Sequence, residues 1–171
     1  MENYLQNKKQ IVEYYYKVKN SGEKWVIFMF MGEYHQKLDE KGRLTIPAKL
    51  RYDLGENFIL TRGLDGCLFI YPKNTWEKIV SNYENLPNIK ETRNFMRFFL
   101  SGASTQEFDK QGRINISSPL IKHSELKKEC VIIGVGQRIE IWGIEKWEEF
   151  TKENEENFSE IADKLFSQNI S

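Results

Sequence analysis

The sequence predicts an α+β fold built from two tandem copies of one strand-turn-strand-helix unit. Three observations support this prediction. A stretch of 15 residues recurs about 70 positions later with its glycines, aspartate and arginine in the same places. Within each copy, short apolar runs that are typical of strands come before residues at helical spacing. Finally, 40% of the 171 residues are hydrophobic and 13% are aromatic, which is enough to bury a core.

The internal repeat extends through most of each half of the chain. Gly32–Ile46 recurs as Gly102–Ile116 at an offset of 70, and Gly, Gln, Asp, Gly and Arg coincide. Further along, four pairs align at an offset of 71: Gly63 with Gly134, Leu68 with Ile139, Tyr71 with Trp142, and Trp76 with Trp147. Two matching blocks in the same order indicate a duplication and not a chance coincidence.

Each copy begins with two short strands around a tight turn. In the first copy, Gln36–Leu38 and Arg43–Ile46 flank the turn Asp39–Gly42. In the second copy, Asp109–Gly112 forms the corresponding turn. Because glycine adopts a positive φ without steric cost, the last residue of each turn is expected in that conformation.

A short helix, two more strands and a longer helix are expected after each turn. Pro47 opens the first short helix, which runs through Leu50, and Ser118 and Pro119 are expected as N-cap and first residue of its counterpart. The strands are expected at Phe58–Thr61, Cys67–Tyr71, Cys130–Ile133 and Arg138–Trp142. The longer helices are expected from Asn74 and from about Ile144, the first with Trp76, Ile79, Val80 and Tyr83 at helical spacing.

A helix is also expected between the two copies, and another near the end of the chain. The first follows Pro87 and has an apolar stripe of Ile89, Thr92, Phe95, Met96 and Phe99. The second has only Ile161, Leu165 and Phe166 on one face, which predicts a weakly anchored helix or an arm that contacts a partner. The predicted division is an extension (1–28), a first repeat (29–86), a linking helix (87–101), a second repeat (102–150) and an acidic C-terminal helix or tail (151–171).

Residues 1–28 have no counterpart in the repeat, and the sequence from Met29 onward looks like a natural protein beginning. Our hypothesis is that this segment is an upstream extension translated from leader sequence. We expect it to be disordered or only peripherally packed.

The composition narrows the classes of function. Lysine plus arginine and aspartate plus glutamate each number 25, but the part before Glu145 has 22 basic and 17 acidic residues. A basic body with an acidic tail permits a polyanionic partner without proving one. Cys67 and Cys130 are too far apart for a metal or redox motif, which favours a reducing cytosol. The longest apolar run, Trp25–Met31, is far shorter than the roughly 20 residues that cross a bilayer. We expect no cofactor, metal, membrane or small-molecule substrate.

The motif Asp-x-x-x-Arg occurs in both copies, at Asp39 and Arg43 and again at Asp109 and Arg113. The turn brings the two side chains of each motif together, so an ion pair is geometrically easy. Taken alone, this pattern favours a structural role in which the aspartate caps its own turn and the arginine pairs with it.

A longer run of residues suggests a function for the motif. Met29–His35, followed by Leu38–Lys49, resembles the opening of MraZ-family proteins, and the second copy supplies their duplicated motif. The resemblance covers about residues 29–165. It implies AbrB-like, swapped-hairpin units that form a pseudo-two-fold, β-barrel-like core with peripheral helices. It also implies a cytoplasmic, nucleoid-associated repressor that binds promoter repeats in double-stranded DNA as a ring-shaped homo-oligomer, upstream of a division and cell-wall gene cluster.

The resemblance makes Arg43 and Arg113 the leading candidates for contacting DNA. An arginine held by a neighbouring aspartate is pre-oriented, so its guanidinium can meet guanine or phosphate with less loss of entropy. We expect Asp39, Asp109, Gly42 and Gly112 to orient the motif without touching DNA. The expected DNA-binding residues are Arg43, Arg113, Lys41, Lys37, Lys49 and Arg51.

The second copy departs from the first in charge. Gln111 replaces the lysine at position 41, and Glu107 stands where the first copy has Lys37. We therefore expect weaker electrostatics in the second copy and unequal DNA contacts by the two halves.

Two other classes of function remain open. A hydrolase could use Cys67 or Cys130 with His35 or His123, but both cysteines lie in apolar, strand-like runs where cysteine usually acts as a small hydrophobic residue. No glycine-rich phosphate loop or carboxylate cluster accompanies them. The other alternative is an oligomeric scaffold or antitoxin-like module that holds a protein partner through the acidic tail.

Overall fold

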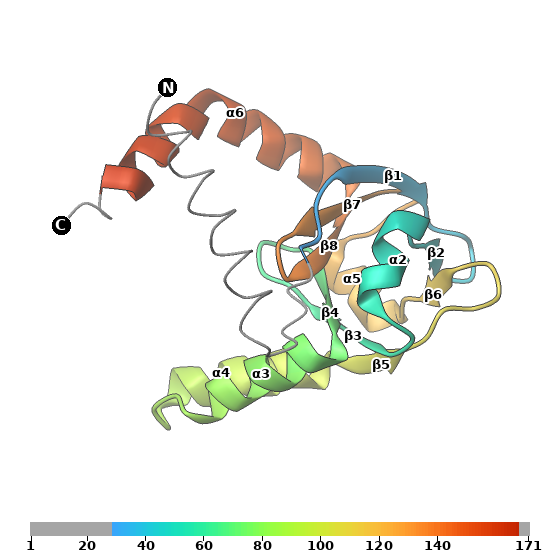
Figure 1. Ribbon diagram of the computed structural model, residues 1–171, viewed down its shortest axis with the longest axis horizontal. Helices are drawn as coiled ribbons and strands as arrows, with labels where there is room; N and C mark the ends of the chain where they lie inside the picture. Colours follow the sequence, from blue (N-terminus) through green and yellow to red (C-terminus); the bar gives the residue numbers. More distant parts are fainter. Residues whose placement is uncertain (1–28, 168–171) are drawn as a thin grey trace, which may run out of the picture.

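Eight strands and five helices make up residues 29–167, the part of the chain that this computed structural model describes (Figure 1). The expected extension at residues 1–28 lies outside the described residues. The first copy contains β1 (Glu33–Lys37), β2 (Arg43–Thr45), α2 (Ala48–Leu54), β3 (Phe58–Arg62), β4 (Leu68–Pro72) and α3 (Lys73–Glu84). The linking helix is α4 (Lys90–Ser101). The second copy contains β5 (Ser104–Gln106), β6 (Arg113–Asn115), α5 (Ser118–Ser124), β7 (Glu129–Val135), β8 (Arg138–Gly143) and α6 (Ile144–Ser167).

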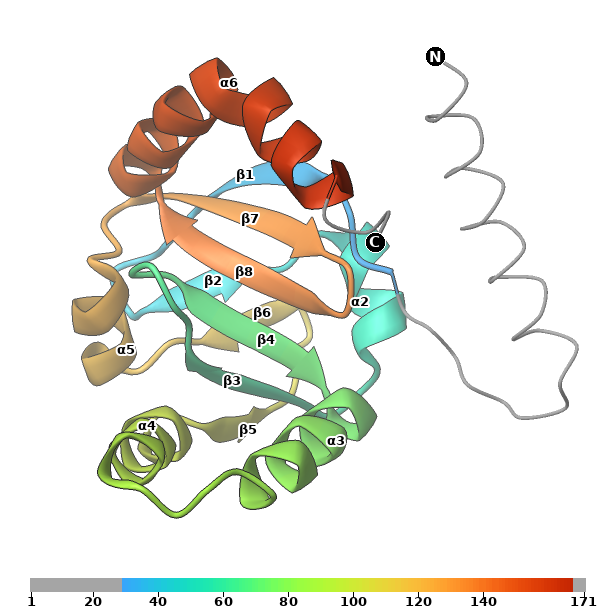
Figure 2. The ribbon, with the colours of Figure 1, turned by 90° about the vertical axis from the view of Figure 1, so that its left-hand side faces the viewer.

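The strands form an antiparallel six-stranded sheet and a separate two-stranded ribbon. The sheet order is β1-β7-β8-β4-β3-β5, and the ribbon pairs β2 with β6 (Figure 2). Exchanging the strands of one copy for those of the other leaves the sheet order unchanged, so a pseudo-two-fold axis passes between β8 and β4. The predicted α+β class is confirmed. Among the described residues, the six-stranded sheet ends at β1 and β5, and the barrel-like detail of the prediction is not confirmed.

The two copies exchange strands. The strands that flank each turn do not pair with each other. Instead, β1 pairs with β7, β5 pairs with β3, and β2 pairs with β6, so each pair joins one copy to the other. The reason is burial, because a single copy has no second layer to cover the inner side chains of its own short strands.

One hydrophobic core lies between the inner face of the sheet, the ribbon and the short helices α2 and α5. Leu44 and Ile46 of the first copy pack there with Ile114 and Ile116 of the second, and all four are almost completely buried. Leu50 of α2 and Leu120 of α5, which occupy equivalent places, belong to the same cluster. The copies therefore share one core.

The outer face of the sheet has a second, largely aromatic cluster. Along β4, Leu68 and Ile70 point into the first core, while Phe69 and Tyr71 alternate with them and join this outer cluster. The strands β7 and β8 add Val131 and Trp142 to this cluster. The helices α3, α4 and α6 add further side chains, among them Trp76, Phe99 and Trp147. The sheet is thus packed on both faces (Figure 2).

The helices differ from the sequence-based expectations in small ways. The N-cap of α5 is Ser117 and not Ser118, and Pro47 is the N-cap residue of α2 and not its first residue. The acidic C-terminal segment continues α6 without a break across residues 150 and 151, as far as Ser167. Within residues 29–167, no helix is long and apolar enough to cross a membrane.

Candidate nucleic-acid interface

The two-stranded ribbon has one face in the core and one face turned outward. Leu44 pairs with Ile114 in its register, and their side chains are 0% and 1% exposed. Because side chains alternate along a strand, the residues on either side of them point the other way. The outward face therefore carries Arg43, Thr45, Arg113 and Asn115.

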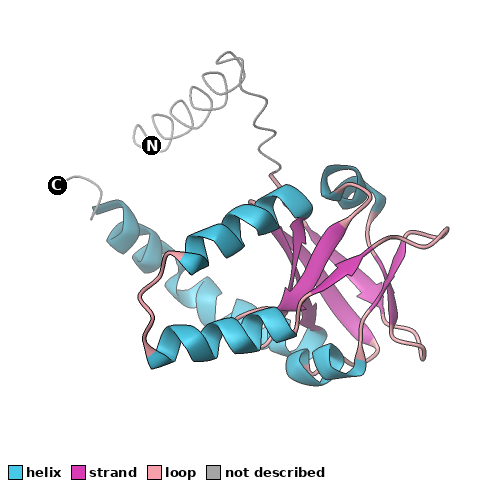
Figure 3. Cartoon of the chain, turned by 90° about the horizontal axis from the view of Figure 1, so that it is seen from below, coloured by secondary structure: helices cyan, strands magenta, loops and turns pink. Residues whose placement is uncertain are grey.

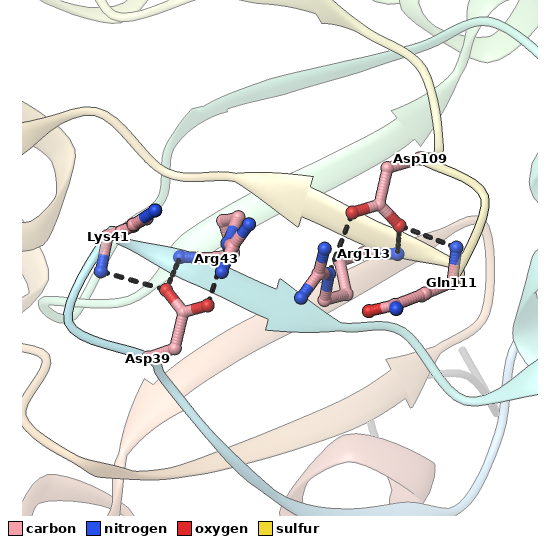
Figure 4. A network of polar contacts seen from close by, with 6 residues as sticks. All are labelled: Asp39, Lys41, Arg43, Asp109, Gln111 and Arg113. Atoms are coloured by element: carbon pink, nitrogen blue, oxygen red, sulfur yellow. Dashed lines mark hydrogen bonds and ion pairs between the residues drawn. The ribbon is translucent and has the colours of Figure 1, made fainter.

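Asp39 organises the first turn and fixes the arginine that follows it. Its Oδ1 accepts hydrogen bonds from the backbone N–H groups of Lys41 and Arg43, both at 2.9 Å. Its Oδ2 accepts a third bond from Arg43 Nε at 2.7 Å (Figure 4). One carboxylate thus both builds the turn and holds the guanidinium, and the sequence-based prediction of an ion pair is confirmed.

The second turn repeats this arrangement almost atom for atom. Oδ1 of Asp109 accepts from the backbone N–H groups of Gln111 at 2.8 Å and Arg113 at 3.0 Å, and Oδ2 accepts from Arg113 Nε at 2.7 Å (Figure 4). The Arg113 side chain is 24% exposed, compared with 35% for Arg43. Each arginine is therefore held at Nε by its aspartate, while part of its side chain remains exposed to solvent.

These hydrogen bonds keep the two aspartates ionised. The bond from the Arg43 backbone N–H lowers the pKa of the Asp39 carboxyl below its ordinary value, and the bond from the Arg43 side chain adds to this effect. The corresponding bonds from Arg113 lower the pKa of Asp109 to about 2. At neutral pH each arginine consequently keeps a charged partner.

The turn glycines connect each turn to the other copy. Gly42 and Gly112 both have a φ of 73°, which confirms the expected positive φ. The carbonyl oxygen of Gly42 accepts a hydrogen bond from Ile116 N–H at 2.8 Å, and that of Gly112 accepts one from Ile46 N–H at 3.0 Å. A Cβ on Gly42 would lie 2.8 Å from the Ile116 carbonyl oxygen, so a side chain does not fit there.

The ribbon brings the two arginines side by side. Arg43 lies opposite Asn115 and Arg113 lies opposite Thr45, which makes the two arginines diagonal neighbours about 7–8 Å apart. Figure 4 shows both guanidinium groups near the middle of the ribbon, with their aspartates toward its ends. Within residues 29–167, both use Nε for the aspartate and neither uses its terminal Nη atoms in a hydrogen bond. Four Nη donor groups are therefore available to a ligand.

The predicted lysines lie at different distances from this pair. Lys41 is exposed in the first turn and adjoins Arg43. Lys37 belongs to β1 in the six-stranded sheet and makes an exposed ion pair with Glu129 at 3.6 Å. Lys49 is exposed on α2. The structure thus joins Lys41 to the arginine pair and leaves Lys37 and Lys49 at its periphery.

Arg51 lies against the turn of the opposite copy. Its guanidinium would collide with a Cβ on Gly112, so it packs directly on the second turn. Its Nε is buried and has no hydrogen-bond partner within residues 29–167. The sequence showed that Arg51 follows the first turn, but it did not show that α2 crosses to the second.

Sequence reasoning missed three further residues at this surface. Thr45 and Asn115 share the outward face with the arginines, and the alternation Arg-Leu-Thr and Arg-Ile-Asn was the signal that could have identified them. Lys110 is exposed in the second turn, where the first turn has Glu40. Together with Arg51, Lys110 adds positive charge to the half that was expected to be weaker.

The residues of the hydrolase alternative do not form a reactive site. Burial raises the pKa of both thiols, that of Cys130 to about 11, so neither is a thiolate at neutral pH. His35 pairs with Glu33, and His123 lies 3.2 Å from the Gly63 carbonyl oxygen. Within residues 29–167, no group of three or more His, Cys, Asp or Glu side chains is placed to hold a metal ion.

Fold and site together define a class of protein: a duplicated, strand-exchanged α+β chain that presents an arginine-bearing β-ribbon. A family described as "MraZ protein, putative antitoxin-like" matches this chain twice, over residues 29–98 and 99–169. Proteins named "Transcriptional regulator MraZ" are similar over 138 residues, which cover 80% of this chain and 96% of each relative. The identity is 53% for the proteins of Lactobacillus gasseri and Lactobacillus johnsonii and 56% for that of Lactobacillus delbrueckii subsp. bulgaricus. The chain belongs to the MraZ family, and these relatives are named as transcriptional regulators.

Proposed function

We propose that this protein is a sequence-specific, DNA-binding transcriptional regulator that reads double-stranded DNA with the outward face of the β2–β6 ribbon. The observation that carries the proposal is the pair of arginines, each fixed by its own aspartate, on a ribbon whose other face is core. The major groove of DNA admits a two-stranded ribbon, and arginine donors match the O6 and N7 atoms of guanine.

The roles of the residues follow from their positions. Arg43 and Arg113 contact bases or phosphates through their Nη atoms. Asp39, Asp109, Gly42 and Gly112 orient them, because a carboxylate close to phosphates would be repelled. The lysines and Arg51 surround the ribbon and suit phosphates, which position the protein without specifying sequence. The residues proposed for phosphate contacts are Lys37, Lys41, Lys49 and Arg51.

We propose the oligomeric assembly and its DNA target from the resemblance to MraZ-family proteins and from the small size of the ribbon site. One ribbon with two arginines reads only a few base pairs, so several copies on repeated DNA elements multiply a weak contact. We propose a homo-oligomeric ring that represses its own division and cell-wall gene cluster in the nucleoid. The two ends of the folded molecule are unlike, because α3 and α4 lie at one end and α6 lies at the other (Figure 2). This difference supports a head-to-tail contact between protomers.

We propose that each segment of the duplicated chain has its own role. Residues 29–86 and 102–150 act as two DNA-contacting halves, residues 87–101 link them, and residues 151–171 form an arm. Native mass spectrometry of the purified chain tests the assembly. A monomer at the concentration at which DNA is bound would contradict the ring.

The decisive test of DNA reading compares the wild type with Arg43→Ala and Arg113→Ala on DNA from upstream of the native gene. Losing a bidentate base contact costs about 1–3 kcal/mol, so each variant should bind about 5- to 150-fold more weakly. Scrambled DNA is the sequence control, and varying the salt concentration estimates the number of phosphate contacts. Arg97→Ala is the matched protein control because Arg97 is exposed on α4, outside the ribbon.

Two outcomes would contradict the proposal. In the first, the wild type binds upstream and scrambled DNA equally. In the second, Arg43→Ala and Arg113→Ala bind as tightly as Arg97→Ala does.

The exposed acidic helix α6 favours a second candidate function, an oligomeric scaffold or an antitoxin-like module that holds a protein partner. Removing the helix after Asn154 separates the two candidates and leaves Trp147, which packs on Trp142 at a ring distance of 5.7 Å, in place. A scaffold should lose its partner, whereas a DNA reader should still bind its operator.

A further inference from the structure

One face of α6 carries apolar side chains that are exposed. Phe150 is 40% exposed, Phe158 is 72% exposed and Ile161 is 40% exposed. Their spacing of eight and three residues places them on the same side of the helix, continuing the side on which Trp147 packs against the sheet. Exposed apolar residues in a row on one helix face indicate a surface that another segment covers.

The other half of the molecule shows how such a face is covered. α3 follows β4 as α6 follows β8, and α3 is covered by α4, which lies beside it in Figure 3. Trp76 of α3 stacks on Phe99 of α4 at 5.3 Å between ring centroids, and Tyr83 meets Phe95 at 5.2 Å. The apolar side chains of α3 are half-buried as a result.

The pseudo-two-fold axis relates α4 to the chain segment before β1. α4 directly precedes β5, and its end is tied to the β3–β4 hairpin by Arg62 Nη1, which donates to the Phe98 carbonyl oxygen at 2.6 Å. In the other half, the chain before β1 is tied to the β7–β8 hairpin by Phe30 N–H, which donates to the Gly136 carbonyl oxygen at 2.7 Å. Residues 1–28 therefore join the described chain at the place where α4 ends in the other half.

Charge and sequence pattern fit residues 1–28 to the face of α6. α6 contains eight acidic and three basic residues, whereas residues 1–28 contain five lysines and three glutamates. The apolar residues Tyr4, Ile11, Tyr15 and Val18 recur at intervals of seven, four and three, which is the pattern of an amphipathic helix. The stripe from Phe150 to Ile161 is about 17 Å long, which 28 residues easily span.

We propose that residues 1–28 dock on the exposed apolar face of α6 of the same chain, in the position that α4 occupies on α3. Phe150, Phe158 and Ile161 form the floor of this contact, and the lysines of the segment meet the acidic flanks of the helix. The proposal does not depend on DNA binding.

Hydrogen exchange of the full-length chain tests the contact. Amides of residues 4–18 should be protected in the wild type, and Phe158→Ser should make them exchange about tenfold faster or more. Phe166→Ser is the matched control because Phe166 is 56% exposed on the same helix but lies outside the stripe. Exchange of residues 4–18 at the rate of an unstructured peptide in the wild type would overturn the proposal, as would equal effects of the two variants.

A zero-length carbodiimide crosslink between the lysines of residues 1–28 and the α6 carboxylates identifies the chain that supplies the segment. In a mixture of ¹⁴N- and ¹⁵N-labelled protein, the proposal predicts crosslinked peptides of unmixed label. Mixed-label peptides in the proportion expected for random pairing would show that a second copy occupies the face, and this result too would overturn the proposal.

Discussion

The alternation along β2 gives a direct test of which ribbon face is core and which is free for DNA. We would replace two adjacent residues, Leu44→Ala and Thr45→Ala, in otherwise identical chains. Leu44 is 0% exposed and pairs with Ile114, which is 1% exposed, in the core that both copies share. Thr45 is on the outward face opposite Arg113 and is half-buried.

The expected magnitudes differ enough to be separated. Truncating a fully buried leucine costs about 2–5 kcal/mol, because apolar contacts are lost and a cavity remains. For a chain of this size, about 2–4 °C of melting temperature is lost per kcal/mol, so Leu44→Ala should melt about 4–20 °C below the wild type. Thr45→Ala removes one half-buried hydroxyl and some strand propensity, so it should cost about 1 kcal/mol or less.

Urea unfolding followed by circular dichroism measures the stability, and DNA binding is measured at a temperature where both variants are folded. Leu44→Ala should lose stability and keep its affinity. Thr45→Ala should keep its stability and lose about fivefold in affinity, as expected when one hydrogen bond of about 1 kcal/mol is removed. The reasoning is refuted if Thr45→Ala is less stable than Leu44→Ala. It is also refuted if the urea concentration at the midpoint of unfolding is the same for Leu44→Ala as for the wild type.

Three other predictions concern the turns. Gly42→Ala should cost about 2–4 kcal/mol in urea unfolding, because alanine is strained at a positive φ and its Cβ meets a carbonyl oxygen at 2.8 Å. Gly136→Ala shares the positive φ but meets nothing within 4 Å, so it should lose only about 1 kcal/mol. Since the folded pKa of Asp109 is lowered to about 2, its contribution is present above about pH 4 and is lost as the pH falls through 2. The melting temperature of Asp109→Asn should therefore lie below that of the wild type at pH 5 and converge with it near pH 2. Arg51→Gln should weaken binding to all DNA sequences alike and lower the salt slope by about one contact, whereas a change in sequence preference would show that Arg51 reads bases.

The elements that local chemistry specifies were predictable from the sequence. The aspartate, the glycine and the arginine of each turn are within four residues of one another, so the ion pair and the positive φ followed from turn geometry alone. The later strands were predictable for a similar reason, because they are apolar runs bounded by turn residues.

The pairing of the strands was not predictable in the same way. The partner of β1 is β7, and the partner of β2 is β6. Both partners are remote in sequence, and their hydrophobic patterns do not match those of β1 and β2 better than other apolar runs do. Hydrophobic spacing shows that a face must be buried but not which segment buries it. A tight turn between two strands favours a hairpin on local grounds, whereas here the two strands pair with strands of the other copy.

The same limit explains which site residues were missed. Arg51 was placed with the first copy because it follows the first turn, but α2 packs across the pseudo-two-fold axis on Gly112 of the second. The counterpart of Lys110 in the first copy is Glu40, so the pattern of that copy gives no signal for a lysine at this place.

Carrying both copies on one chain allows the two ends of the ribbon to differ, which an exchange between identical subunits does not. The residues that α2 and α5 place beneath the opposite turns are Arg51 under Gly112 and Ile121 near Gly42, where a Cβ would lie 3.4 Å from Ile121 Cδ1. One end of the ribbon thus lies on the guanidinium of Arg51 and the other lies on the apolar side chain of Ile121. The paired motifs Asp39–Arg43 and Asp109–Arg113 are nearly superimposable, so the specific contacts can be alike in both halves. The two ends of the ribbon differ in the charge around them, because Arg51 and Lys110 lie at the second turn. If the ribbon contacts DNA as proposed, the end with Arg51 has the stronger attraction for phosphate, while the arginines that contact bases are held alike at both ends.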